Sequence, residues 1–210
     1  MHRYFIRTPW VVRKIFSSYI WNLPAKEPVV YITFDDGPHP EITPWVLEQL
    51  KKYGVKASFF CIGNNVRQFP EVYRQIIDEG HATGNHTYHH LNGWKTPDRA
   101  YLNDIAAAAE LIPTNLFRPP YGRIKGRQAR QLPGLLKKQV KIIMWDVLSA
   151  DFDRNFSPEE CYRNVVDHVR PGSIIVFHDS EKAWPNLVHA LPRTLEFLRG
   201  NGYICKKIEL

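Results

Sequence analysis

Short apolar runs alternate with longer segments of helical character along most of the chain. Runs of this length that are bounded by turn signals are typical of buried strands. They lie at 29–34, 56–62, 81–85, 116–118, 141–147, 173–178 and 203–208. Strands that alternate with helices predict a parallel α/β sheet. About seven such repeats without a glycine-rich dinucleotide fingerprint favour a small (β/α)7 barrel over a doubly wound sheet.

Capping residues mark several helix ends. Ser157-Pro158-Glu159-Glu160 fits a capping box at a helix start. Further start signals stand at Thr43-Pro44 and Thr96-Pro97, and stop signals at Gly54, Gly80 and Gly200.

The first 24 residues have a different pattern, with aromatic and aliphatic residues interleaved with Arg3, Arg7, Arg13 and Lys14. The spacing predicts an amphipathic helix that starts after Thr8. Because prolines follow at positions 24 and 28, we expect a helical segment over 1–24 and one domain over 25–210. The segment either packs on that domain or rests on a membrane surface as a basic, aromatic helix.

Composition and charge exclude several classes of protein. The net charge of +7 favours anionic partners such as phospholipid headgroups, but no dense basic block or nucleic-acid motif is present, which excludes nucleic acid as a partner. Three widely spaced cysteines indicate neither a disulfide framework nor a Cys-x-x-Cys zinc site. No run is long enough to span a membrane, and charges interrupt any signal-peptide core. We therefore expect a cytoplasmic monomer, with the inner membrane face as the alternative location.

Two adjacent carboxylates, Asp35 and Asp36, follow the first apolar run. Neighbouring carboxylates raise each other's pKa unless a cation or a hydrogen-bond network neutralises them, and a metal ion would do so. His86 and His90 are four residues apart and would share a face if this segment made one helical turn. Two histidines and an aspartate leave a coordination position open, as catalytic zinc sites do.

Further polar clusters follow the later strands. They lie at 86–90, 118–122, 146–153 and 178–179. In a parallel barrel the carboxyl ends of the strands meet at one rim, where active sites of such barrels lie. The sequence therefore predicts one site that gathers all of these clusters.

At this point the motifs resemble those of the polysaccharide deacetylase family, also called the NodB-homology domain or carbohydrate esterase family 4. The resemblance covers about residues 29–208. It rests on Thr-Phe-Asp-Asp-Gly-Pro at 33–38, His-Thr-x-x-His at 86–90, Arg-Pro-Pro-Tyr-Gly at 118–122 and the strand with His-Asp at 174–179. It implies a distorted, TIM-like barrel that lacks one or more of the eight strands.

The resemblance also implies a hydrolase that cleaves linear amides, removing N-acetyl groups from amino-sugar glycans with one divalent metal ion. Zn²⁺ is the expected ion, and Co²⁺ or Ni²⁺ could replace it. By position it implies Asp36, His86 and His90 as metal ligands, Asp35 as general base, His178 as general acid, Arg118 as the residue that orients Asp35, and Tyr121 as an oxyanion donor through its backbone N–H.

One motif departs from the family pattern, Asp-x-x-Asp-Trp after the fifth strand. Leu148 stands where the first Asp is expected, Asp151 matches the second, and Phe152 replaces Trp. Since the first Asp usually tunes the histidine acid, we predict that Asp146 or Asp151 partners His178 instead.

Aromatic and apolar residues near these motifs are candidates for substrate contact, because rings stack on sugar faces. The candidates are Trp94, Pro120, Tyr121, Phe177 and Trp184. The substrate is expected to be peptidoglycan or a chitin-like oligosaccharide. One alternative is a deacylase, for acetyl or formyl groups, of a lipid-linked amino sugar at the cytoplasmic membrane face. The other is a non-catalytic sugar-binding homologue.

Overall fold

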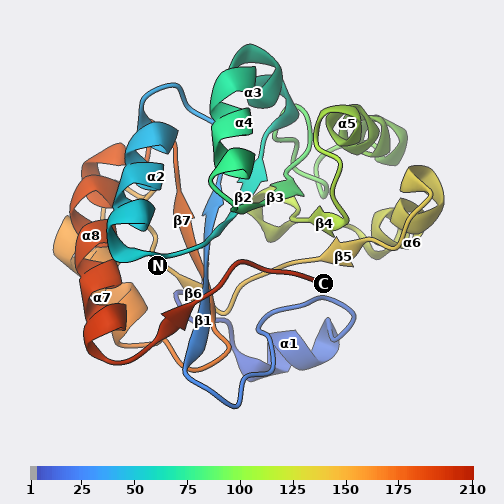
Figure 1. The fold of residues 1–210 in the computed structure, drawn as a ribbon. Coiled ribbons are helices and arrows are strands. Elements are labelled where there is room, and N and C mark those ends of the chain that lie inside the picture. Colours follow the sequence, from blue (N-terminus) through green and yellow to red (C-terminus); the bar gives the residue numbers. More distant parts are fainter. Residues whose placement is uncertain (1–3) are drawn as a thin grey trace.

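A parallel sheet forms the centre of the computed structural model, which describes residues 4–210 (Figure 1). The strands are paired in the order β5-β4-β3-β2-β1-β7-β6, and β8 pairs with β1. Their bounds are β1 Val29–Asp35, β2 Ser58–Cys61, β3 Ala82–Asn85, β4 Leu116–Phe117, β5 Lys141–Ile142, β6 Val147–Leu148, β7 Ile174–His178 and β8 Ile204–Cys205. The predicted parallel barrel fold is confirmed.

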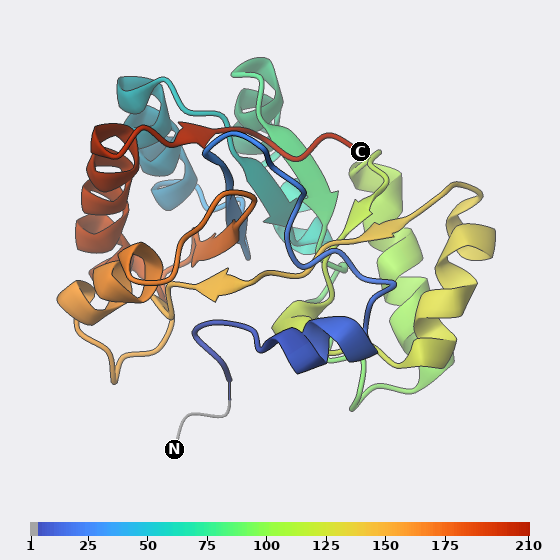
Figure 2. The same ribbon diagram turned by 90° about the horizontal axis from the view of Figure 1, so that it is seen from below.

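The run predicted as one strand over 141–147 forms two short strands, which corrects that prediction. β5 pairs with β4 and β6 pairs with β7, so this segment joins the two ends of the strand order (Figure 2). Between them, the Met144 N–H donates to the Ile20 carbonyl instead of to a neighbouring strand. The extended chain is continuous, but its partner changes half-way along.

Helices cover the outer face of the curled sheet (Figures 1 and 2). Their bounds are α2 Ile42–Tyr53, α3 Gly63–Gln68, α4 Pro70–Asp78, α5 Asp98–Leu111, α6 Gly126–Leu136, α7 Pro158–Val166 and α8 Trp184–Gly200, with a 3-10 turn, η1, at Pro120–Gly122. The capping box at Ser157 is present. Gly54 caps the end of α2 in the left-handed conformation.

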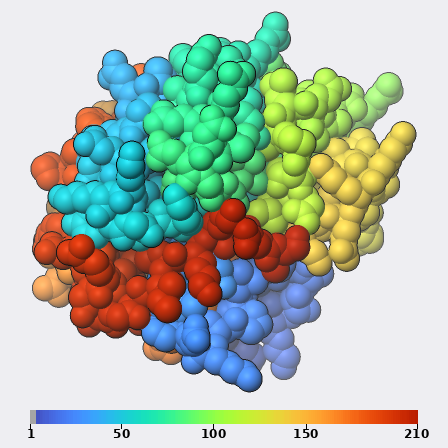
Figure 3. All heavy atoms as spheres, viewed as in Figure 1, coloured from blue at the N-terminus to red at the C-terminus, as the bar shows by residue number. Residues whose placement is uncertain are grey.

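Two apolar layers enclose the sheet. The larger lies between the strands and the helices α2, α7 and α8 and includes Phe34, Leu47, Phe177 and Leu195. A smaller cluster, around Phe60, Ile143 and Ile174, is built by side chains from several strands and by Ile208 near the C-terminus. The C-terminal residues, dark red in Figure 3, lie between the N-terminal segment and helices α2 and α4.

The N-terminal segment lies along the side of the sheet where β5 passes to β6 (Figure 2). Its helix α1 spans Trp10–Ile15, with Pro9 as N-cap. β-bridges join Arg7 to Val147, Ile20 to Ile143 and Asn22 to Ser173. Trp21 is buried in a third apolar cluster with α5 and α6. Within residues 4–210, no helix combines the length and apolar character that crossing a membrane requires.

Candidate active site

The carboxyl ends of the strands carry the polar side chains. Asp35 ends β1 and lies directly opposite His178, the last residue of β7. Asp35 is also in register with Phe60 of β2, and β2 with β3, so the segment that follows Asn85 reaches the same rim. Parallel register therefore brings residues about 50 and 140 positions apart to one place.

Asp36, His86 and His90 form a group of potential metal ligands. One ligand atom from each lies within 4.8 Å of the others. The Oδ1 atom of Asp36 is 3.1 Å from Nε2 of His90 and 3.7 Å from Nε2 of His86. The segment is not the helical turn considered from the sequence, since both Thr87 and His90 have positive φ angles. An irregular loop brings the two rings together, with centroids 5.0 Å apart.

The donor set fits a divalent metal ion. Asp36 Oδ1 is buried and has no well-formed hydrogen bond to any described residue. Nδ1 of His86 is 2.8 Å from the Arg118 carbonyl, so Nδ1 carries the proton and the Nε2 lone pair faces Asp36. Two lone pairs and a carboxylate that converge without a donor between them are stabilised by a cation.

The charges of this group follow from its surroundings. Burial lowers the pKa of His86 to about 4 despite the nearby carboxylates, so the ring is neutral at pH 7. Burial would raise the pKa of Asp36, but the close contact with His90 and the charge of His178 lower it below its usual value. Neutral imidazoles and an ionised carboxylate are the forms that bind metal.

Asp35 is held by Arg118. The guanidinium donates to Asp35 Oδ1 at 2.6 Å and to the Thr33 hydroxyl at 2.7 Å, and its other nitrogens donate to the carbonyls of Ile143 and Met144. Arg118 is fully buried. Because four of its five N–H donors are bound in these contacts, Arg118 fixes one carboxylate oxygen of Asp35 and leaves the other available.

His178 is paired with Asp151 and not with Asp146. Asp151 accepts hydrogen bonds from Nδ1 and the backbone N–H of His178, both at 2.8 Å. Asp146 instead accepts from Ser173 and Ile174. Burial opposes protonation of His178, but the charge and hydrogen bond of Asp151 raise its pKa to about 9. The imidazole is therefore cationic at neutral pH and can donate a proton from Nε2.

Tyr121 lies beside the metal-ligand group. Its ring centroid is 4.7 Å from that of His90, its φ is +60°, and 60% of its surface is exposed. Among residues 4–210 its backbone N–H has no hydrogen-bond acceptor. The preceding Pro120 is buried. Trp94 is also exposed, and its indole N–H donates to the Ile124 carbonyl at 3.1 Å.

Two of the substrate-contact candidates pack against the apolar layer between the sheet and the helices. Phe177 is fully buried and stacks on Phe34 in the layer between sheet and helices. Trp184, at the start of α8, packs edge-on against Trp45 and that same layer. Side chains alternate along a strand, so a residue next to His178 points to the opposite face.

Sequence reasoning missed the residues that hold the ligand loops. Asp104, in the middle of α5, accepts hydrogen bonds from the N–H groups of Tyr88 and His89 and from His89 Nδ1. Nothing in the pattern of that helix indicates this role.

Asp179 holds the other ligand loop. It accepts from the Gly37 N–H and from the Thr43 hydroxyl. Any Cβ on Gly37 would lie 2.0 Å from Asp179 Oδ2, so only glycine fits. Thr43 was expected to mark the start of a helix, but α2 starts at Ile42 and the Thr43 side chain is used for this contact.

Comparison with known proteins agrees with this geometry. Residues 22–134 match the model of the family described as polysaccharide deacetylase. The chain belongs to this family. A peptidoglycan-N-acetylglucosamine deacetylase of Bacillus cereus is 36% identical over 169 residues, 78% of this chain and 60% of the relative. A chitooligosaccharide deacetylase of Azorhizobium caulinodans is 34% identical over 160 residues, 71% of this chain and 73% of the relative.

A solved structure resembles this chain over nearly its full length. It is a peptidoglycan N-acetylglucosamine deacetylase in complex with a naphthyl-substituted N-hydroxybenzamide, with a TM-score of 0.81, 31% identity and coverage of 96% of this chain and 95% of the other. The chain spans 60% of the length of the Bacillus cereus relative named above.

Proposed function

We propose that this chain removes N-acetyl groups from amino-sugar glycans, such as peptidoglycan or chitin-like oligosaccharides, with one divalent metal ion, preferably Zn²⁺. The observation that carries the proposal is the convergence of three potential ligands within 4.8 Å, beside a carboxylate held by Arg118 and an imidazole held by Asp151. The names of the relatives support the substrate class.

Asp36, His86 and His90 would hold the metal. When bound, the ion supplies Lewis-acid polarisation of the amide carbonyl and lowers the pKa of bound water from ~15.7 to ~7. The chain supplies the groups that move protons and orient the substrate around it.

Asp35 acts as the general base. Its Oδ1 is occupied by Arg118, so Oδ2 is left to accept the proton of the attacking water. The Arg118 guanidinium keeps the carboxylate in one orientation, and a positioned base contributes about 10²–10⁴-fold to the rate.

His178 and Tyr121 act on the other two reacting atoms. His178, with a pKa of about 9, donates its Nε2 proton to the departing amine, which is a poor leaving group unless it is protonated. The Tyr121 N–H donates to the substrate oxygen that gains charge during attack, and one such donor contributes about 3–4 kcal/mol.

Release of acetate from acetylated chito-oligosaccharides by the zinc-loaded protein tests this proposal. The matched variant is Asp35→Asn, which keeps the shape of the side chain and the three metal ligands. We expect it to bind zinc as the unchanged protein does and to lose acetate release by about 10²-fold or more. Full activity of Asp35→Asn, or no acetate release by the unchanged zinc-loaded protein, would contradict the assignment.

A second candidate has the same chemistry on a lipid-linked amino sugar, acetylated or formylated, at the inner face of the cytoplasmic membrane. It is favoured by the large exposed apolar residues of the N-terminal segment: Phe5, Trp10, Val11, Ile15 and Phe16. Arg13 and Lys14 lie among them. Exposed aromatic residues flanked by cations are typical of helices that rest on anionic membranes.

Flotation with vesicles that contain anionic lipid tests this candidate. The variants Trp10→Ala and Ile15→Ala remove side chains that are 65% and 68% exposed, whereas Ile77→Ala removes a side chain of α4 that is 46% exposed. We expect the first two to float less than the unchanged protein and Ile77→Ala to float equally. Equal flotation of all variants would count against membrane contact.

A further inference from the structure

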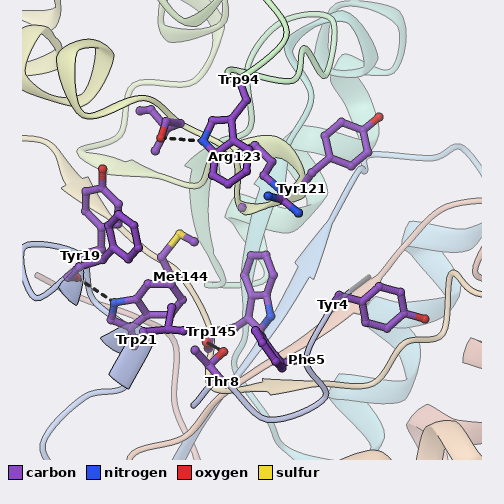
Figure 4. Close-up of a pocket in the computed structure, with 14 residues that line it drawn as sticks. Tyr4, Phe5, Thr8, Tyr19, Trp21, Trp94, Tyr121, Arg123, Met144 and Trp145 are labelled. Carbon is purple, nitrogen blue, oxygen red and sulfur yellow. Dashed lines mark hydrogen bonds between the residues drawn. The ribbon is translucent and has the colours of Figure 1, made fainter. Parts of the chain in front are cut away.

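An apolar pocket lies between the N-terminal segment and the site. Its volume is about 250 Å³. Its walls come from the N-terminal segment, from the loop that carries Tyr121, and from the residues between β5 and β6 (Figure 4). Tyr121 belongs both to this wall and to the site, since its ring also packs on His90. The pocket therefore begins one side chain away from the metal-ligand group.

Four polar side chains of the pocket wall already donate hydrogen bonds to other parts of the protein. Thr8 donates to the Trp145 carbonyl, Trp21 to the Phe16 carbonyl and Trp94 to the Ile124 carbonyl (Figure 4). Tyr4 donates to Asp153. A sugar ring placed in this pocket would lose hydrogen bonds to water and regain few, which costs free energy. A hydrocarbon group has no hydrogen bonds to water to lose, and it gains contact with aromatic surface.

One charged residue is present among the described residues that line the pocket. Arg123 stacks over the Trp94 ring, with its guanidinium carbon 4.0 Å from the ring centroid. No described carboxylate lines the pocket. A hydrocarbon group joined to the rest of the ligand through a phosphate would match this combination.

We propose that this pocket binds a hydrocarbon group attached through a phosphate to the amino sugar whose acetyl group is removed. The inference rests on the proposed function, in which the group removed is acetyl. An acetyl group is too short to fill the pocket. The hydrocarbon therefore belongs to the part of the substrate beyond the sugar, and the N-terminal segment acts as a specificity element of the site.

Hydrolysis of two glycosides measures the preference. We expect a higher kcat/KM for octyl than for methyl N-acetyl-β-glucosaminide, by about fourfold for each methylene group buried. Val12→Trp, which fills the pocket, should abolish most of this preference and leave hydrolysis of the methyl glycoside unchanged. Trp10→Ala, in the same segment but outside the pocket wall, should keep it. Equal rates for both glycosides, or an equal loss of preference in the two variants, would overturn the proposal.

A third substrate tests whether the pocket takes a hydrocarbon on the acyl side or on the opposite side of the sugar. Methyl glucosaminide carrying an N-octanoyl group presents the same hydrocarbon on the acyl side. We expect it to be hydrolysed no faster than the N-acetyl compound. A preference for the octanoyl compound would overturn the assignment of the pocket to the part beyond the sugar.

A binding measurement keeps the pocket testable when no hydrolysis is seen. Octyl phosphate, below its micelle concentration, should shift the indole N–H resonances of Trp21, Trp94 and Trp145 in a saturable way and leave those of Trp45 and Trp184 unchanged. Arg123→Gln should weaken this binding about tenfold, and much less for octyl glucoside. Uniform or absent shifts, or equal weakening for both compounds, would overturn the proposal, whatever the activity.

Discussion

Two largely buried imidazoles on the same rim differ in charge, since one is neutral and the other is cationic at pH 7. His86, after β3, has its Nδ1 next to a backbone carbonyl and a pKa lowered to about 4, chiefly by burial. His178, at the end of β7, has its Nδ1 next to the Asp151 carboxylate, and its pKa is raised to about 9 against the effect of burial. The partner of Nδ1 decides whether a buried histidine is a ligand or an acid. The predictions below test this difference.

Removing the neutral imidazole should have the largest effect. His86→Gln leaves Asp36 and His90 with one ligand fewer, and we expect more than 100-fold weaker zinc binding, because even the partners of ligands contribute about 10–100-fold. Acetate release should fall in parallel. Zinc titration of the purified variant measures the loss. His81→Asn, at a buried histidine outside the ligand group, serves as control and should bind zinc normally.

Removing the carboxylate that makes His178 cationic should have a smaller, pH-dependent effect. His178 must be protonated to act, so activity falls as the pH rises through its pKa of about 9. In Asp151→Asn this pKa decreases and the alkaline limb of kcat/KM moves to lower pH, with a loss about tenfold greater at pH 8.5 than at pH 6. Asp146→Asn is the control, because Asp146 bonds to Ser173 and Ile174. An unmoved limb in Asp151→Asn would contradict the pairing.

The loop that supplies His90 depends on Asp104, and its loss should weaken metal binding without removing a ligand. In Asp104→Ala three hydrogen bonds to Tyr88 and His89 are lost. We expect about tenfold weaker zinc affinity. Asp98→Ala removes a carboxylate from the same helix that bonds to Lys125 and Arg127 and should leave the zinc affinity unchanged. Equal affinities in the two variants would contradict this role of Asp104.

A third buried imidazole extends the comparison to stability. Burial lowers the pKa of His81 to about 4, and its Nδ1 accepts the Ala57 N–H. The unfolded chain binds the proton near pH 6.5, so the stability from neutral His81 is present above that pH and is lost as the pH falls toward 4. We expect the contribution of His81 to the free energy of unfolding to fall by about 1 kcal/mol between pH 7.5 and pH 6. Urea unfolding of the metal-free protein should show a smaller loss for His81→Asn, and an identical loss would contradict the assignment.

The strands could be predicted because their apolar runs are short and separated by capping residues. The division of 141–147 could not, since it depends on a change of hydrogen-bond partner from β4 to β7. The gathering of the reactive residues at one rim could be predicted because a parallel sheet places the carboxyl ends of its strands together. The loop geometry could not be predicted, because Asp36, His90 and Tyr121 adopt positive φ angles, which are uncommon for residues other than glycine.

The carboxylate that partners His178 could also not be chosen from the sequence alone. Asp146 and Asp151 are equivalent candidates for His178 on the chain, but Asp146 lies just before β6 and Asp151 lies in the turn after it. Asp104 could not be found at all, since a carboxylate in a helix is ordinary until its acceptor contacts are known.

The stretch that joins β5 to β6 forms hydrogen bonds with Arg118 on one side and with the N-terminal segment on the other. The carbonyls of Ile143 and Met144 accept from Arg118, while the Met144 N–H donates to Ile20. The family match starts at residue 22, just after that contact. A fragment that begins at the family boundary would therefore lose the contact with Ile20 that holds the residues whose carbonyls bind Arg118. The kinetics of such a fragment would not represent those of the longer chain.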